Sequence, residues 1–247
     1  MERTLLSVAF DVDLDLDLDL AAYGTAPSRE CCYDAQSQST EQGAGGQPGD
    51  SCTACSRSEA EMRNLVFAIN ISLDGCCDHT KFNPDEETLA YFTHLTRDAD
   101  TFLYGRKTYQ LMVPYWPDVA KNPSGHTKAE IEFAQAFDAI SKIIVFSQSL
   151  DSPEGNKTRI VRTSLRDEIL KLKQEQGKNI FTGGVTIPSQ LVELGLIDEY
   201  YFVVHPIVVG EGRRLFEDVK QREKLQLKLI ESRIFKSGCV ALRYSKQ

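Results

Sequence analysis

The chain has 247 residues and a formal net charge of −8, but the charge is confined to one end. Residues 1–61 carry 12 acidic and 3 basic side chains, whereas residues 62–247 carry 24 acidic and 25 basic ones. The nearly neutral body offers no basic face for nucleic acid and no basic amphipathic segment for a membrane surface. No run of 18 apolar residues is present, so we expect neither nucleic acid nor a membrane as a partner.

The first 61 residues have the composition of an acidic, low-complexity tail. Residues 11–20 alternate aspartate with apolar residues, but five aspartates on one face of a strand would repel each other, so a disordered segment is favoured. Residues 34–51 have the composition of a linker. Met62 begins a self-sufficient domain, residues 62–247. One interpretation of the tail is therefore that the start of the protein has been assigned too early in the sequence.

The seven cysteines bear on metal binding and on the compartment. Four fall in the tail: Cys31, Cys32, Cys52 and Cys55. The last two have zinc-like spacing, but an adjacent cysteine pair is a poor source of two tetrahedral ligands, and we expect no metal. Cys76, Cys77 and Cys239 make a poor disulfide framework. The apolar stretch near the N-terminus is too short for a secretory signal, so we expect a cytoplasmic protein.

Apolar periodicity predicts alternating strands and helices after the tail. The expected strands are 65–71, 101–104, 142–146, 179–182 and 200–209, the last interrupted at Pro206. The expected helices are 85–97, 130–140, 165–174 and 188–194. Two final strands, 224–230 and 240–245, have no helix between them. The pattern predicts an α/β fold with a mostly parallel sheet, helices on both faces and an antiparallel hairpin at the C-terminal edge.

Two strand ends are candidate phosphate sites, because ligands of such sheets bind where strands run into helices. Gly105-Arg106-Lys107-Thr108 combines a glycine, a helix start and two cations, although a solvated glycine turn is an equally good interpretation. Gly183-Gly184-Val185-Thr186 precedes another helix, and Thr186 is placed to cap it at Pro188. Two such helix openings on one sheet favour a dinucleotide.

A third strand ends at Ser147 and Gln148, which could meet an adenosine ribose or its phosphate. Alone, this pair is typical of any loop. The G-x-G-x-x-G fingerprint and the G-x-x-x-x-G-K-[ST] phosphate loop are both absent from the sequence. The absence of the first motif disfavours an ordinary Rossmann dehydrogenase.

These segments, in this order, resemble the reductase domain at the C-terminus of the bifunctional riboflavin-biosynthesis deaminase-reductase, in its stand-alone form. That domain has the dihydrofolate-reductase fold, and the resemblance spans residues 63–245. The matching segments are Ser72-Leu73-Asp74-Gly75, 104–109, 143–147, Gly183-Gly184, 195–199 and 206–212.

The resemblance implies a dihydrofolate-reductase-like three-layer fold, NADPH as hydride donor, a small-molecule substrate and a possible homodimer. It implies phosphate contacts along Gly105, Arg106, Lys107 and Thr108, and pyrophosphate contacts along Gly183, Gly184, Val185 and Thr186. Ser147 and Gln148 would lie near the adenosine end, although relatives often have arginine at the position of Gln148. Asn70, Ile71 and Asp74 would lie near the nicotinamide and the substrate entrance.

Three functions are compatible with these features. The first is an NADPH-dependent reductase of a small heterocycle such as a ribosylaminopyrimidine, the second a dihydrofolate or pterin reductase, and the third a nucleotide-binding module without turnover. Dihydrofolate reductases place a carboxylate at the start of the first helix, where Thr88 stands here, so folate reduction is disfavoured. The deaminase signature is missing as well. Trp116 could line the cleft or pack over the sheet, and His205 is better explained as a core histidine than as a catalyst.

Overall fold

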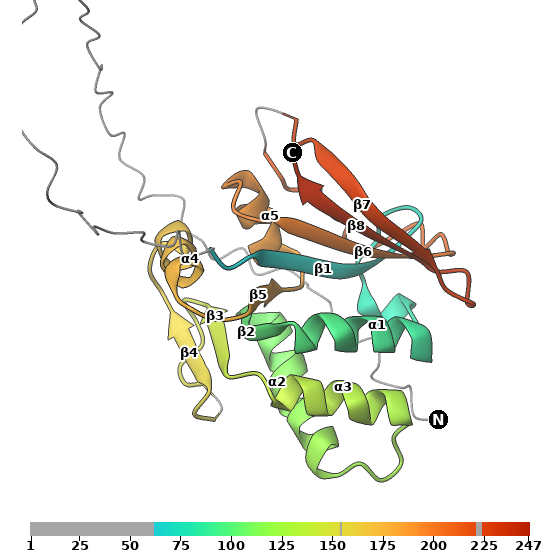
Figure 1. Cartoon of the computed structure of the whole chain (residues 1–247), viewed down its shortest axis with the longest axis horizontal. Coiled ribbons are helices and arrows are strands. Elements are labelled where there is room, and N and C mark those ends of the chain that lie inside the picture. The colour runs from blue at the N-terminus through green and yellow to red at the C-terminus, as the bar shows by residue number, and fades with distance from the viewer. Residues whose placement is uncertain (1–61, 154, 221–223) are drawn as a thin grey trace, which may run out of the picture. The chain divides into compact units, whose positions relative to one another are not determined.

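Eight strands form one sheet in the order β4-β3-β2-β5-β1-β6-β8-β7 (Figure 1). The structure, a computed structural model, describes residues 62–153, 155–220 and 224–247. The expected disorder of the tail and the four tail cysteines lie outside these residues. The strands are β1 (Leu65–Ser72), β2 (Ala99–Gly105), β3 (Lys142–Phe146), β4 (Thr158–Val161), β5 (Asn179–Thr182), β6 (Glu199–His205), β7 (Leu227–Ile234) and β8 (Val240–Lys246).

Five α-helices and a short 3₁₀ helix of the described residues complete three layers. They are η2 (His79–Lys81), α1 (Glu86–Arg97), α2 (Arg106–Lys121), α3 (Lys128–Asp138), α4 (Leu165–Gln174) and α5 (Thr186–Glu193). Helices α1, α2 and α3 lie on one face of the sheet, and α4 and α5 lie on the other (Figure 1). The predicted fold class, a three-layer α/β arrangement, is therefore confirmed.

The strands from β4 to β6 are parallel, whereas β8 pairs antiparallel with both β6 and β7. The predicted C-terminal antiparallel pair is thus confirmed. The central strand β1 is almost entirely buried, because parallel strands are covered on both faces and read as continuous apolar runs. The edge strand β7 is different, since its last residue, Ile234, is 78% exposed.

Several predicted boundaries were wrong for identifiable reasons. The expected strand 200–209 ends at His205, because Pro206 has no N–H to donate to a neighbouring strand. The expected strand 224–230 is instead Leu227–Ile234, at an exposed edge where apolar periodicity specifies register weakly. The four-residue strand β4 was not predicted at all, because its outer residues are partly exposed and its apolar run is short.

Two helix starts also differ from expectation. Helix α3 begins at Lys128, two residues early, because Thr127 and Glu130 form a capping box. Helix α5 begins at Thr186 rather than Pro188, with Val185 as the N-cap residue. The predicted capping role of Thr186 was therefore wrong, since that residue already lies inside the helix.

Candidate cofactor site

The segments predicted to hold phosphates follow two neighbouring strands. Strand β5 lies between β1 and β2, and Thr182 pairs in register with Phe67 on one side and Leu103 on the other. The Thr182 hydroxyl donates to the Leu103 carbonyl oxygen at 2.9 Å, which fixes the end of β5 against β2. Because all three strands are parallel, Gly105 and Gly183 leave the sheet at the same edge.

Helices α2 and α5, which begin at this edge, have no side-chain cap. Helices α1, α3 and α4 begin with Asp85, Thr127 and Ser164, each of which accepts a backbone N–H with its side chain. The N-cap residues of α2 and α5 are Gly105 and Val185, and neither makes a side-chain cap hydrogen bond. A helix start without a side-chain acceptor is suited to a phosphate oxygen.

The starts of α2 and α5 also lie close together. A Cβ atom built on Gly105 would be 3.4 Å from Cγ1 of Ile187 in the first turn of α5. Gly184 has a φ of +84°, in the left-handed region that side chains disfavour, so glycine is required for the turn into α5. The sequence-predicted phosphate segments are thus brought together, with glycine where the backbone is most constrained.

Arg213 brings a cation to this edge that the sequence interpretation missed. Its Nη1 donates to the Thr186 hydroxyl at 3.1 Å, and its charge is shared with Asp218 at 2.7 Å and Glu217 at 3.5 Å. The sequence does contain a signal for this residue, because the Gly210-Glu211-Gly212 segment is followed directly by two arginines. Thr186 therefore acts as an acceptor for this loop, not as a helix cap.

Two further guanidinium groups contact the loop of residues 147–150, in which Ser147 and Gln148 are predicted to lie near adenosine. Arg106 Nη1 donates to Ser149 Oγ at 2.9 Å, and Arg162 Nη2 donates to the Leu150 carbonyl oxygen at 2.5 Å. Gln148 Nε2 reaches the Arg162 carbonyl oxygen at 3.4 Å. Arg162 follows β4, and sequence reasoning missed it together with that strand.

The remaining predicted cofactor residues have more internal roles. The Ser147 hydroxyl accepts backbone N–H groups of Ser149 at 3.2 Å and Leu150 at 3.0 Å, so it shapes its own loop. Lys107 is half-buried in the first turn of α2, and Thr108 beside it is buried. The predicted adenosine contact of Ser147 would therefore use an oxygen that already has two donors.

Asp74, a predicted substrate-side residue, joins two loops. Its carboxylate accepts hydrogen bonds from Ser72 Oγ at 2.5 Å, Gly210 N at 2.9 Å and Val209 N at 3.1 Å, and Arg214 Nη1 lies at 3.1 Å. These hydrogen bonds, that of Ser72 first, hold the pKa of the Asp74 carboxyl well below its ordinary value. An ionised carboxylate with this many donors is suited to ordering the loops rather than to giving up a proton.

Asn70 and Ile71 lie near the carboxyl end of β1. Asn70 is buried, and its Oδ1 is 3.0 Å from Nε2 of His205 at the end of β6. Ile71 is half-buried against the core. Both nitrogens of the His205 ring have partners, the second being Cys239 Sγ at 3.3 Å, which confirms the interpretation of a satisfied core histidine.

Other residues considered from the sequence are buried. Trp116 is fully buried and packs against Phe133 of α3 at 4.6 Å between ring centroids, so it lines no cleft. Cys76 and Cys77 are fully buried and form no disulfide. Thr88 is fully buried, and its hydroxyl has no hydrogen-bond partner.

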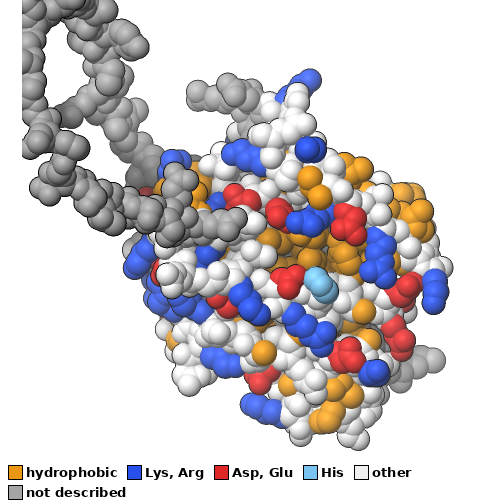
Figure 2. Space-filling view, in the orientation of Figure 1, with side chains coloured by type: hydrophobic (Ala, Val, Ile, Leu, Met, Phe, Trp, Pro, Cys, Tyr) orange, Lys and Arg blue, Asp and Glu red, His pale blue; other side chains and the backbone are white. Residues whose placement is uncertain are grey.

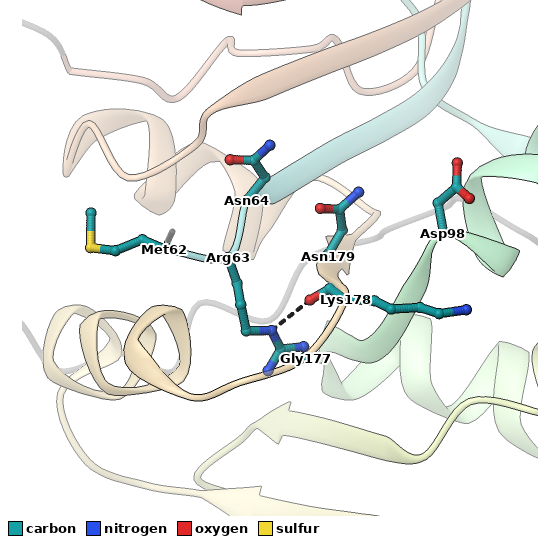
Figure 3. Close-up of a pocket in the computed structure, with 7 residues that line it drawn as sticks. All are labelled: Met62, Arg63, Asn64, Asp98, Gly177, Lys178 and Asn179. Atoms are coloured by element: carbon teal, nitrogen blue, oxygen red, sulfur yellow. Dashed lines mark hydrogen bonds between the residues drawn. The ribbon is translucent and has the colours of Figure 1, made fainter. Parts of the chain in front are cut away.

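A recess of about 440 Å³ opens at the opposite edge of the sheet (Figure 3). Its lining residues are Met62, Arg63, Asn64, Asp98, Gly177, Lys178 and Asn179. They lie at the amino ends of β1, β2 and β5, whereas the predicted site residues lie at or after the carboxyl ends of strands. The recess is therefore separate from the candidate cofactor site.

The described residues show few features of other site types. In Figure 2, acidic and basic side chains are interspersed, with no continuous basic patch on the face shown. None of the described helices combines the length and apolar character needed to cross a membrane. Within the described ranges, no group of three or more His, Cys, Asp or Glu side chains is arranged to hold a metal ion.

Comparison of the sequence with known proteins identifies its family and two relatives. Residues 63–241 match the family described as the RibD C-terminal domain. The uncharacterised protein YyaP of Bacillus subtilis is 33% identical over 192 residues, which cover 74% of this chain and 95% of that protein. YwjB of the same organism is 27% identical over 176 residues, covering 67% of this chain and 90% of that protein.

Solved structures agree on the fold. A putative riboflavin biosynthesis protein from Shewanella sp. PV-4 is similar with a TM-score of 0.54 and 21% identity, over 75% of this chain and 99% of that one. A deaminase/5-amino-6-(5-phosphoribosylamino)uracil reductase from Thermotoga maritima gives a TM-score of 0.56 and 14% identity, over 75% of this chain and 57% of that one. The chain belongs to the RibD C-terminal domain family.

Proposed function

We propose that this chain is an NADPH-dependent reductase of a small heterocyclic substrate, chemically related to 5-amino-6-(5-phosphoribosylamino)uracil. The family supports a nicotinamide cofactor in general. The observation that carries the proposal is the pairing of two helix starts without side-chain caps, α2 and α5, at the carboxyl ends of adjacent strands. A dinucleotide has several phosphates, and two such helix starts provide donors for more than one of them.

The residues at this edge fit the phosphates of the cofactor. Gly105 to Thr108 would hold one phosphate, and Gly183 to Thr186 the pyrophosphate. Gly184 has the left-handed backbone that the turn needs, and Arg106 adds positive charge at the start of α2. Bound there, the cofactor supplies the hydride, and the protein binds it, orients it and keeps water from the reacting atoms.

The choice of NADPH over NADH rests on the loop of residues 147–150. Gln148 carries no charge to meet a 2′-phosphate, but Arg106 and Arg162 reach this loop from two sides. Guanidinium groups recognise phosphate oxygens in a bidentate manner. We assign the 2′-phosphate to the surface between these two arginines, with Ser147 and Gln148 beside the ribose.

The substrate end lies near the carboxyl end of β1. Asn70 and Ile71 would border the nicotinamide, and Asp74 would order the loops that enclose the substrate. Thr88 supplies no carboxylate at the start of α1, where a pterin would need one, and this favours a pyrimidine-type acceptor over folate. If NADPH binds and no acceptor is reduced, the chain is instead a nucleotide-binding module without turnover.

Two further expectations belong to this proposal. The exposed apolar side chains of β7, Leu229, Ile230 and Ile234, lie at the edge of the sheet and favour a homodimer. The three cysteines of the described residues form no disulfide, as is usual in the reducing cytoplasm. Sedimentation of the full chain and of an Ile234→Lys variant would test the dimer, which should dissociate in the variant.

The test is a titration followed by an acceptor panel, using the full chain. We expect quenching of protein fluorescence by NADPH at micromolar concentration, with weaker binding of NADH. NADPH oxidation should follow with 5-amino-6-(5-phosphoribosylamino)uracil and not with dihydrofolate. Oxidation with dihydrofolate alone would overturn the substrate assignment, and failure of both nicotinamides to bind would overturn the proposal as a whole.

A further inference from the structure

Three buried side chains from distant parts of the chain form a continuous hydrogen-bonded series. Cys239 Sγ lies 3.3 Å from Nδ1 of His205, and Nε2 of the same ring lies 3.0 Å from Oδ1 of Asn70. The three residues are 4%, 5% and 5% exposed, respectively. Asn70 and His205 lie on neighbouring parallel strands, β1 and β6, and Cys239 directly precedes β8.

The chemistry of Asn70 and Cys239, at the two ends of the series, shows which groups donate and which accept. The Asn70 oxygen can only accept, so Nε2 of His205 must carry a proton. Burial lowers the pKa of His205, and the Asp85 carboxylate opposes only part of this effect. A neutral ring with its proton on Nε2 has an acceptor at Nδ1, and the Cys239 thiol is the donor that this nitrogen receives.

The same trio of residue types also serves as a nucleophilic site in cysteine hydrolases, where the thiol gives its proton to the imidazole. That role requires a charged pair and access for an acyl substrate. Here the thiol is buried, and burial opposes the imidazolium form. The geometry therefore favours a neutral structural series over a reactive thiolate.

The consequence concerns the amide of Asn70. Among the hydrogen bonds of the described residues, its oxygen is engaged by His205 and its nitrogen has no partner. While the proton of the His205 ring is on Nε2, this asparagine cannot exchange its oxygen and nitrogen positions without losing a buried hydrogen bond. Its two N–H donors therefore have one set direction.

We propose that Cys239 and His205 are positioning residues that hold the Asn70 amide with its nitrogen as a donor toward a carbonyl oxygen of the heterocyclic acceptor. The inference rests on the proposed function, because it assigns a role at the substrate end of that site. It adds two residues, His205 and Cys239, to which the proposed function assigns no contact with the cofactor. With the Asn70 nitrogen as the donor, acceptors that have a ring carbonyl beside the reacting atoms should bind better than acceptors that have a hydrogen-bond donor at that position.

The surroundings hold the series in place. Phe82 stacks on the His205 ring at 4.8 Å with an interplanar angle of 26°. The turn between β7 and β8, which carries Cys239, is tied to the start of α1 because Lys236 N donates to Glu87 Oε2 at 2.7 Å. Asp85 is the ionisable group whose charge acts on His205, and its side chain is already engaged as the cap of α1.

The first experiment maps the proton on His205 by long-range ¹H–¹⁵N correlation in the full chain labelled at histidine. The sequence has four histidines, and the signals of His205 are those lost in a His205→Gln variant. We expect the proton on Nε2 and an unprotonated Nδ1. A proton on Nδ1 alone, or on both nitrogens, would overturn the inference, and this measurement needs no cofactor or substrate.

The second experiment compares Cys239→Ala with Cys239→Ser as a matched control. Serine keeps a hydroxyl donor for Nδ1, whereas alanine leaves this nitrogen unpaired and lets the ring proton redistribute. With 5-amino-6-(5-phosphoribosylamino)uracil as the acceptor, KM should rise about tenfold in the alanine variant, which corresponds to roughly 1.4 kcal/mol. The serine variant should stay close to the parent, and the affinity for NADPH should be the same in both.

The outcomes separate this inference from the proposed function. Equal acceptor KM in the alanine and serine variants, with NADPH still bound, would overturn the positioning role and leave the cofactor assignment intact. If the parent chain bound no nicotinamide, the proposed function would fail instead, and the proton map would decide the hydrogen-bonded series alone. If the alanine variant did not fold, the pair His205→Leu and His205→Gln would replace it, since a glutamine amide can still donate to Asn70 and a leucine cannot; KM should rise in the leucine variant only, and equal KM in the two would overturn the positioning role.

Discussion

The two edges of the parallel sheet differ in how their polar groups are satisfied. At the amino edge, beside the recess, Arg63 is buried and donates to Asp100, to Thr101 Oγ1 at 3.0 Å and to the Lys178 carbonyl oxygen at 2.5 Å. At the carboxyl edge, the N-cap residues Gly105 and Val185 provide no side-chain acceptor. The amino edge thus has an open recess beside a buried guanidinium group that is paired within the protein.

The comparison shows that an open recess is a weaker sign of function than a set of donors arranged for an external acceptor. The amino edge is a structural junction, further tied by Lys173 Nζ, which lies 2.6 Å from Asp198 Oδ2. Asp198 also accepts the Leu65 backbone N–H at 2.7 Å, at the start of β1. Substitutions there should therefore affect stability, whereas substitutions at the carboxyl edge should affect cofactor affinity.

The largest effect is expected for Gly184→Val at the carboxyl edge. A valine would be strained at a φ of +84° and would place a branched side chain where the pyrophosphate must approach. We expect NADPH affinity to fall at least about a thousandfold, roughly 4 kcal/mol, in a fluorescence titration. Gly195→Val is the matched control, since Gly195 also has a positive φ, +65°, but follows the end of α5. An equal loss of affinity in both variants would contradict the site assignment.

The second prediction concerns Arg63→Met at the amino edge. The change leaves the Asp100 carboxylate without its buried partner, and the free energy of unfolding should fall by about 3 kcal/mol, at the low end for buried pairs because Asp100 is partly exposed. Urea denaturation would measure this loss. The NADPH affinity of the folded variant should match the parent, and a clear change in that affinity would mean that the recess belongs to the cofactor site.

The smallest effect is expected for Arg162→Ala. This variant tests only one part of the carboxyl edge, the proposed 2′-phosphate site. Removing this guanidinium should weaken NADPH binding about tenfold, roughly 1.4 kcal/mol, and leave NADH binding unchanged. Raising the salt concentration should reduce the difference between parent and variant, because Arg162 is exposed. Equal losses for both nicotinamides would place Arg162 outside the 2′-phosphate site.

Sequence reasoning was most successful where local pattern decides structure. The buried strands β1 and β3 are mostly apolar runs, and the glycine segments at 105 and 183–184 mark the helix starts that follow neighbouring strands. It failed at β4 and at the boundaries of β7, where short or exposed strands carry little apolar signal.

Other features depend on contacts between residues far apart in the chain. Asn70 and His205 are separated by 135 positions, and Arg213 reaches Thr186 across 27 positions. Each of these residues has an ordinary local context, since a histidine in an apolar strand or an arginine after a glycine loop fits many structures. Only the pairing of β1 with β6 and the return of the loop after β6 bring them to the site.

Amide hydrogen exchange of the full chain, measured with and without saturating NADPH, would show which edge of the sheet the cofactor contacts. We expect slower exchange at residues 105–108 and 183–186, the two helix starts of the carboxyl edge, with a smaller effect at 147–150. Exchange at 62–64 and 177–179, beside the recess, should be unchanged. Protection confined to the residues of the recess would contradict the assignment of the cofactor to the carboxyl edge.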